Sequence, residues 1–130
     1  MPAQNVIANL FATIYNGELR NMKECLVIPS SKLASHVLRS MQKNRYIGEF
    51  ELIDDGLGGK LKIQLIGKIN GCKAISPRFS VKLGEYSRWE RQYLPAVGLG
   101  ILIVSTSKGV MDHTEAQEMN LGGRLVGYVY

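Results

Sequence analysis

A continuous apolar run that stops abruptly in small polar residues limits the folds open to this chain most strongly. Residues 101–104 read Ile-Leu-Ile-Val, and Ser-Thr-Ser-Lys-Gly follow at once over residues 105–109. An unbroken apolar and β-branched run is typical of a central strand that is covered on both faces. The polar segment after it contains no imidazole, thiol or carboxylate. We therefore expect a rigid strand that ends in a hydrogen-bonding surface built to bind rather than to react.

Size and composition are those of a small globular protein without a membrane segment. The chain has 130 residues, of which 45% are hydrophobic, which argues against disorder. Its longest apolar run, residues 96–104, is far shorter than the roughly 20 residues that a membrane helix needs. The N-terminus lacks a signal-peptide pattern. Cys25 and Cys72 have no short spacing, so we expect reduced core thiols and a cytoplasmic protein.

Apolar periodicity over the first half predicts an N-terminal α/β subdomain, residues 1–70. The expected order is helix, strand, helix and hairpin, over residues 3–16, 24–28, 32–44, 47–53 and 60–66. Gly17 is expected to end the first helix, and Ser30 and Ser31 are candidate caps of the second. The segment 67–77 is rich in glycine and asparagine and is expected to be a connection.

The second half, residues 71–130, is expected to be a mainly β subdomain with short helices. The pattern predicts strands over 78–83, 101–104 and 124–130, a helix or extended loop over 85–93, and a short helix over 112–118 that Asp112 caps. The fold class is therefore α+β, in two small subdomains. A unit of about 65 residues buries only about 60% of its unfolded surface, so we expect the two to share an apolar interface.

Basic charge is gathered in two blocks rather than spread evenly. The net charge is +5 and the calculated pI is about 9.3, which favours a polyanionic partner. Lysine and arginine concentrate in residues 19–45 and 60–91, and the acidic stretch 46–59 separates these blocks. In the expected hairpin the glutamates of one strand, Glu49 and Glu51, face lysines of the next, which gives much of the acidic stretch a structural role.

The sequence lacks the residue patterns that most catalytic sites and metal sites need. His36, His113 and the two cysteines are not at ligand spacing, so we expect no metal site. The segment 55–60 resembles a phosphate loop but lacks its Gly-Lys-Ser/Thr ending, and a hairpin turn explains it better. A small serine hydrolase that pairs Ser105 or Ser107 with His113 stays open as an alternative, although no nucleophile elbow surrounds either serine. We expect no enzyme, no cofactor and no small-molecule substrate.

Several independent features favour RNA as the partner. Ser30, Ser31 and Lys32 open a helix and offer hydroxyls, amides and a cation to a phosphate, although a simple N-cap explains them too. Basic and aromatic residues alternate in a second segment, at Arg78, Lys82, Tyr86, Arg88, Trp89 and Arg91. A place in the core is the competing interpretation for Trp89 and Tyr93. The hydroxyl run 105–107 fits the shallow minor groove of an RNA helix. A third interpretation is a protein–protein interaction module without RNA affinity, but it does not explain the two basic blocks.

Specific motifs then resemble those of the ribosomal protein S8 family of the small subunit. The resemblance is strongest over Ser105 to Met111, followed by Gly122-Gly123 and the closing Gly-Tyr-Val-Tyr of residues 127–130. It extends over the whole chain, through the segments 28–33, 46–50 and 75–79. Gly-Glu-Phe-Glu at 48–51 and the extended segment 85–94 are similar to the archaeal and eukaryotic type. The Ser-Thr-Ser-Lys-Gly run favours an archaeal member. Gln117 departs from the basic residue that many members carry.

The resemblance implies a structural protein that binds directly to a helix of the central domain of small-subunit ribosomal RNA, early in assembly. By motif, Ser105, Thr106 and Ser107 would enter the minor groove, and Gly122 and Gly123 would let the backbone approach it. Ser30, Ser31 and Lys32 would hold phosphates. Tyr86 is a further RNA-contacting residue by position, and Lys32, Arg78, Lys82 and Lys108 are expected to neutralise phosphates. Neighbouring ribosomal proteins are expected partners. Repression of its own messenger RNA, as in bacterial members, is the alternative.

Overall fold

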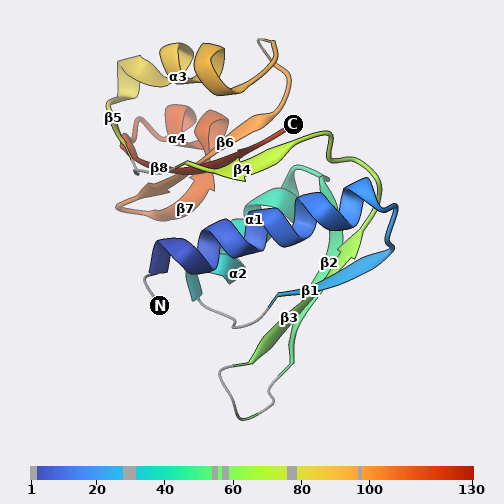
Figure 1. Ribbon diagram of the computed structural model, residues 1–130. Helices are drawn as coiled ribbons and strands as arrows, with labels where there is room; N and C mark the ends of the chain where they lie inside the picture. The colour runs from blue at the N-terminus through green and yellow to red at the C-terminus, as the bar shows by residue number, and fades with distance from the viewer. Residues whose placement is uncertain (1–2, 28–31, 54–55, 57–58, 76–78, 97) are drawn as a thin grey trace.

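The computed structural model describes residues 3–27, 32–53, 56, 59–75, 79–96 and 98–130, with side chains from residue 6 onward. Two antiparallel sheets form the frame of this part of the chain (Figure 1). The first has the strand order β1-β3-β2, and the second has the order β4-β8-β6-β7, with β5 pairing to β8. Helices and strands therefore separate into an α+β fold of two subdomains, as the sequence predicts. The division at residue 70 stays a prediction.

The first sheet belongs to the N-terminal half. Its elements are α1 (Ala3–Leu19), β1 (Glu24–Val27), α2 (Lys32–Lys43), β2 (Ile47–Ile53) and β3 (Lys60–Leu65). Strand β3 lies between β1 and β2, with Ile63 opposite both Cys25 and Phe50. The expected charge pairing in the hairpin differs in detail. Glu51 does lie opposite Lys62, but the Lys62 ammonium pairs with Glu24 of β1 at 3.5 Å.

The second sheet belongs to the C-terminal half. Its elements are β4 (Cys72–Ala74), β5 (Ser80–Val81), the short 3₁₀ turn η1 (Leu83–Glu85), α3 (Tyr86–Tyr93), β6 (Ile101–Thr106), β7 (Gly109–Asp112), α4 (His113–Glu118) and β8 (Gly123–Val129). Asp112 caps α4 as expected, because its carboxylate accepts the Glu115 amide at 2.7 Å. No helix in these described ranges is long and apolar enough to cross a membrane.

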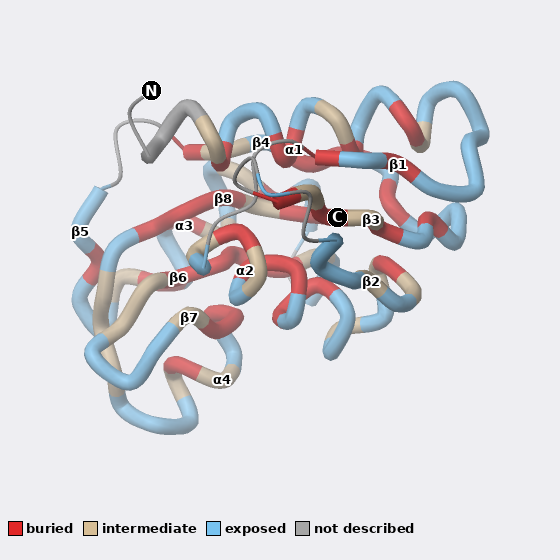
Figure 2. The backbone as a smooth tube through the Cα atoms, turned by 90° about the horizontal axis from the view of Figure 1, so that it is seen from below, coloured by how far each residue is buried: buried red, intermediate tan, exposed pale blue. Residues whose placement is uncertain are grey.

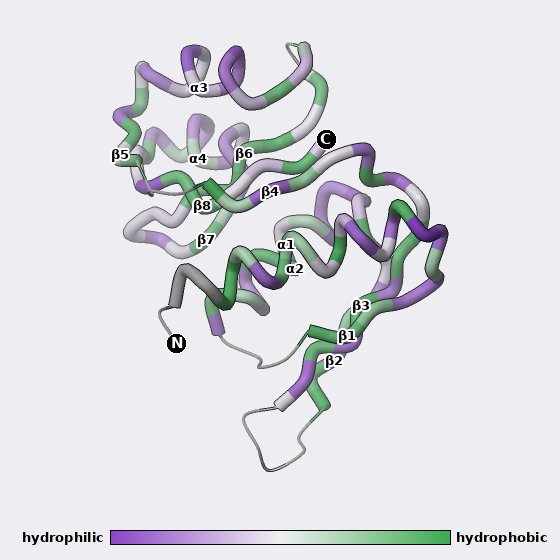
Figure 3. Tube along the Cα trace, in the orientation of Figure 1, coloured by the Kyte–Doolittle hydropathy of each residue, from purple (hydrophilic) through white to green (hydrophobic). Residues whose placement is uncertain are grey.

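Strand β6 is covered on both faces, which confirms the prediction from its apolar run. Ile101 and Ile103 belong to a core cluster shared with α1, α2 and the first sheet, whereas Leu102 and Val104 belong to a second cluster with α3 and α4. All four residues are buried. Figure 3 shows apolar colour along β6 and β8, between the two layers of helices.

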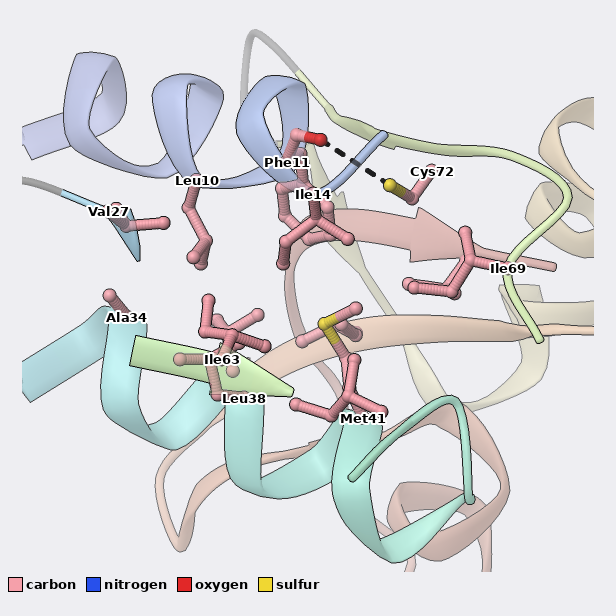
Figure 4. Packing of buried hydrophobic residues seen from close by; sticks show 14 of the residues in the cluster. Leu10, Phe11, Ile14, Val27, Ala34, Leu38, Met41, Ile63, Ile69 and Cys72 are labelled. Atoms are coloured by element: carbon pink, nitrogen blue, oxygen red, sulfur yellow. Dashed lines mark hydrogen bonds between the residues drawn. The ribbon is translucent and has the colours of Figure 1, made fainter. Parts of the chain in front are cut away.

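The first cluster joins the two subdomains. Phe11 of α1 packs against β8, where a Cβ at Gly127 would lie 2.6 Å from its ring. The Cys72 thiol of β4 donates to the Phe11 carbonyl oxygen at 3.5 Å, and Figure 4 shows this contact beside Ile14 and Ile69. The expected shared apolar interface is therefore present, and helix α1 is its centre.

Three local expectations were wrong. Gly17 does not end the first helix, which continues to Leu19; a Cβ at Gly17 would lie 2.7 Å from Leu65, so glycine allows α1 to approach β3. The connection expected over 67–77 contains strand β4, and strand β7 has no counterpart among the predicted elements. The strand expected over 78–83 is described only as Ser80–Val81.

Candidate nucleic-acid interface

The hydroxyl run at the end of β6 forms the tight turn to β7. Thr106 closes this turn, because its hydroxyl donates to the Gly109 carbonyl oxygen at 2.7 Å and accepts the Lys108 amide at 3.1 Å. Gly109 has φ of +115°, a conformation that other residues rarely adopt. The turn is thus held in one shape by its own side chain. Figure 2 shows buried β6 giving way to exposed chain on the side of β7.

The residues of the turn divide between structural and exposed roles. Ser107 and Lys108 are exposed, whereas Ser105 and Thr106 are half-buried. Since the Thr106 hydroxyl is already engaged on both its donor and acceptor sides, Ser107 and Lys108 are the two groups of the turn most available to a ligand. Short hydroxyl and long ammonium side chains on a fixed turn suit hydrogen bonding to sugar and phosphate.

Strand pairing places a further cation, Arg124, beside the turn. This residue was not among the predicted RNA contacts. Arg124 of β8 lies opposite Ser105 of β6 on one side and Ser80 of β5 on the other. Paired residues share a face of the sheet, so the exposed Arg124 lies between two serines. Its position directly after Gly122-Gly123 was the available signal. Only the register of β8 shows which face it takes.

Close packing within the protein explains why residues 122 and 123 are glycines. A Cβ at Gly122 would lie 2.6 Å from the Val81 carbonyl oxygen, and one at Gly123 would collide with the Ser105 carbonyl oxygen and lie 2.9 Å from Val104. Both glycines are therefore required where β8 enters between β5 and β6. Direct approach of their backbone to RNA stays a prediction.

Tyr86 does not lie on the surface, which corrects its expected role as an RNA contact. The residue is fully buried, and its hydroxyl donates to the Leu121 carbonyl oxygen at 2.8 Å. Burial raises the pKa of this hydroxyl, so it stays protonated as the donor. Tyr86 holds the segment that leads into Gly122 and acts on the surface only through it.

Two of the remaining expected contacts, Lys32 and Lys82, belong to the described residues. Lys32 is exposed at the first residue of α2, and Lys82 is exposed directly after β5. Lys82 is close to the glycine pair, since a Cβ at Gly122 would lie 3.3 Å from its Cα. Ser30, Ser31 and Arg78 lie outside the described residues.

A row of stacked aromatic rings includes Trp89 of the basic and aromatic segment, together with Phe79, Tyr93 and Tyr128. The rings of Phe79 and Trp89 lie 5.0 Å apart between centroids, those of Trp89 and Tyr93 lie 6.1 Å apart, and those of Tyr93 and Tyr128 lie 5.3 Å apart. Trp89 is only 8% exposed, which confirms the core interpretation for it, and Tyr93 is half-buried. The Arg88 guanidinium lies 5.4 Å from the Trp89 ring centroid. This row is chiefly structural.

His113 is fully engaged in holding helices together, which removes the serine-hydrolase alternative. It is 5% exposed. Its Nδ1 accepts the Leu102 amide at 3.0 Å, and its Nε2 lies 3.1 Å from the Glu90 carboxylate. With Nδ1 occupied by a donor, the ring proton is on Nε2 and points to Glu90. Neither nitrogen is available as a base for Ser105 or Ser107.

The other reactive groups are also inert. Cys25 and Cys72 are free and buried. Burial raises the pKa of Cys25 to about 11 and that of Cys72 to about 12, so both remain neutral thiols. Within the described ranges, no group of three or more His, Cys, Asp or Glu residues could hold a metal ion. The site is therefore a binding surface of hydroxyls, glycines and cations.

Known proteins are similar to this chain over nearly its full length. The family model for Ribosomal protein S8 matches residues 5–130. The chain is 57% identical over 130 residues to the Small ribosomal subunit protein uS8 of Nitrosopumilus maritimus (strain SCM1). It is 55% identical over 130 residues to the protein of the same name from Cenarchaeum symbiosum (strain A). Both alignments cover 100% of each chain, and both organisms are archaea.

Proposed function

Because the chain belongs to the ribosomal protein S8 family, we propose that it binds a helix of the central domain of small-subunit ribosomal RNA and helps that domain to assemble. It is a structural, non-enzymatic protein of the small subunit of the cytoplasmic ribosome, and binding to ribosomal RNA is general for this family. The choice of the central domain, and of the residues that contact it, is our proposal.

One observation carries this proposal: the β6–β7 turn is fixed by Thr106 and presents Ser107 and Lys108 at the end of β6, where Ser105 pairs with Arg124 of β8. Figure 1 shows this turn, β5 and the start of β8 at the same end of the second sheet. A rigid turn can enter the shallow minor groove of an RNA helix, where riboses display their 2′-hydroxyls. The serines would read that shape, and Lys32, Arg78, Lys82 and Lys108 would neutralise phosphates on either side. Ser30 and Ser31 would support Lys32 there.

The test is a titration of the purified protein against fragments of small-subunit ribosomal RNA, followed by footprinting. We expect one helix of the central domain to bind far more tightly than a generic duplex. Ser107→Ala should weaken binding to the cognate helix much more than to the duplex, because only the cognate groove fits the turn. Ser87→Ala is the matched control, since Ser87 is exposed on α3, away from the turn. Equal losses on both RNAs would contradict the proposal.

Salt dependence tests the phosphate contacts separately. Lys32→Ala should lower the slope of log affinity against log salt by up to about 0.9, the value for one phosphate contact on duplex DNA. An unchanged slope would show that Lys32 does not touch the backbone. Including the protein's own messenger RNA in the same titration tests translational repression. Binding that matches the ribosomal helix would favour it, and binding no tighter than the duplex would exclude it.

A further inference from the structure

A basic hollow lies between the two subdomains, directly beside the β6–β7 turn. It has a volume of about 310 Å³ and is lined by His36, Arg39 and Lys43 of α2, Lys108 and Gly109 of the turn, and Glu115 of α4. Helix α2 packs against β7, which holds the two walls of the hollow together. Lys108 belongs both to the hollow and to the proposed RNA surface, so the two are continuous.

The hollow keeps an excess of positive charge after its internal ion pair is counted. Lys43 lies 3.0 Å from Glu115, the one carboxylate among the residues that line it. The hydrogen bond to Glu115 raises the pKa of Lys43, so this pair stays ionised and neutral overall. In the described part of the chain, Arg39 and Lys108 form no ion pair. Two cations therefore remain.

A row of basic residues that includes Arg39 continues along one face of α2. Lys32, His36, Arg39 and Lys43 are spaced four, three and four residues apart, which places them on one side of a helix. The opposite side, formed by Ala34, Val37, Leu38 and Met41, is buried in the shared core. Lys32 and Lys43 are eleven residue steps apart, which corresponds to about 16 Å along the helix. The row thus runs from the hollow to Lys32, which the proposed function already assigns to a phosphate.

We propose that the RNA backbone runs from the β6–β7 turn across this hollow and onto the basic face of α2, with a phosphate seated between Arg39 and Lys108. This inference rests on the proposed function and extends it to a continuous contact with both subdomains. Arginine suits the position, because its guanidinium can donate two hydrogen bonds to one phosphate. Packing of α2 against β7 holds the backbone segments that carry Arg39 and Lys108 together before RNA arrives.

The first test uses Arg39→Gln, with Arg20→Gln as the matched control. Both arginines are exposed and lie in the same basic block of the sequence, but Arg20 follows α1 and does not line the hollow. Arg39→Gln should weaken binding to the cognate ribosomal RNA fragment by about fivefold and lower the salt slope by about 0.7 to 0.9. Arg20→Gln should leave both values unchanged, and Arg39→Lys should restore most of the slope.

The second test maps the path of the RNA directly. Because Cys25 and Cys72 are buried, a cysteine introduced at the surface can carry a tethered hydroxyl-radical probe selectively. Probes at His36→Cys and at Ser107→Cys should cut neighbouring positions of the same RNA. If only the Ser107→Cys probe cuts, and Arg39→Gln behaves like Arg20→Gln, this inference is overturned while the proposed function stands. If the wild-type protein shows no preference for ribosomal RNA, the proposed function itself fails, and this inference fails with it.

Discussion

Removing the Thr106 hydroxyl should loosen the β6–β7 turn without changing its bulk. Thr106→Val replaces the hydroxyl by a methyl group of similar shape. It deletes both the hydrogen bond to the Gly109 carbonyl oxygen at 2.7 Å and the one from the Lys108 amide at 3.1 Å. Valine suits a strand end as well as threonine does, so β6 itself should persist. The perturbation is therefore confined to the shape and mobility of the turn.

The expected loss follows from these two bonds. A hydrogen bond of this kind contributes roughly 0.5–1.5 kcal/mol, and the turn is exposed, so water can replace part of each bond. We therefore expect the substitution to destabilise the folded conformation of the turn by about 1–2 kcal/mol. Binding must restore that conformation, so RNA affinity should fall by about fivefold to thirtyfold. The free energy of global unfolding should fall by no more than the same amount.

The assay combines RNA titration with amide hydrogen exchange of Lys108. In Thr106→Val this amide should exchange faster and RNA should bind more weakly. Thr106→Ser keeps the oxygen and should behave as the wild type in both measurements. Ser107→Ala should weaken binding while leaving exchange unchanged, because Ser107 contributes no bond to the turn. The reasoning is refuted if Thr106→Val binds RNA as tightly as Thr106→Ser.

Two further predictions concern the buried polar groups. His113→Ala should lower the free energy of unfolding by roughly 2–4 kcal/mol in urea titrations, because it leaves the Leu102 amide and the Glu90 carboxylate without their partner; a loss below about 1 kcal/mol would contradict this role. Stability should also fall as pH rises above about 9, since thiols of the unfolded chain ionise there while Cys72, with its pKa raised to about 12, stays protonated in the folded protein. That residue alone contributes about 1.4 kcal/mol per pH unit between those values, so Cys72→Ala should show a visibly shallower decline, and an equal decline would refute the assignment.

Local sequence patterns predicted the elements whose signals are themselves local. The apolar run 101–104 predicted a strand that is covered on both faces, and the capping residue Asp112 predicted the start of α4. Strands β4 and β7 were missed because they are only three and four residues long. The partner of β4, strand β8, also lies far along the chain, whereas β7 pairs with β6 directly across the turn. Gly17 was misread for a related reason, since the Leu65 side chain that it accommodates comes from a distant strand.

The candidate site shows the same division. The exposed turn at Ser107 and Lys108 could be found from residue chemistry alone, because a glycine-ended polar segment follows a buried strand. Tyr86 could not, since the face of α3 that it occupies is decided by packing against Leu121. For Arg124 the sequence offers only its position after Gly122-Gly123, because strand register alone places it between Ser80 and Ser105.

The packing of Phe11 against β8 also sets the order of events during synthesis. The ring closes over Gly127, and the two residues lie near opposite ends of the chain. A nascent chain that emerges from its N-terminus therefore cannot complete the shared core until β8 has left the ribosome. Until then the side of α1 that carries Phe11 lacks its cover from β8, and exposed apolar surface of this kind favours aggregation and engagement of chaperones. The shared core, and with it the part of the RNA-binding surface that β8 carries, therefore forms only after residues 123–129 have been made.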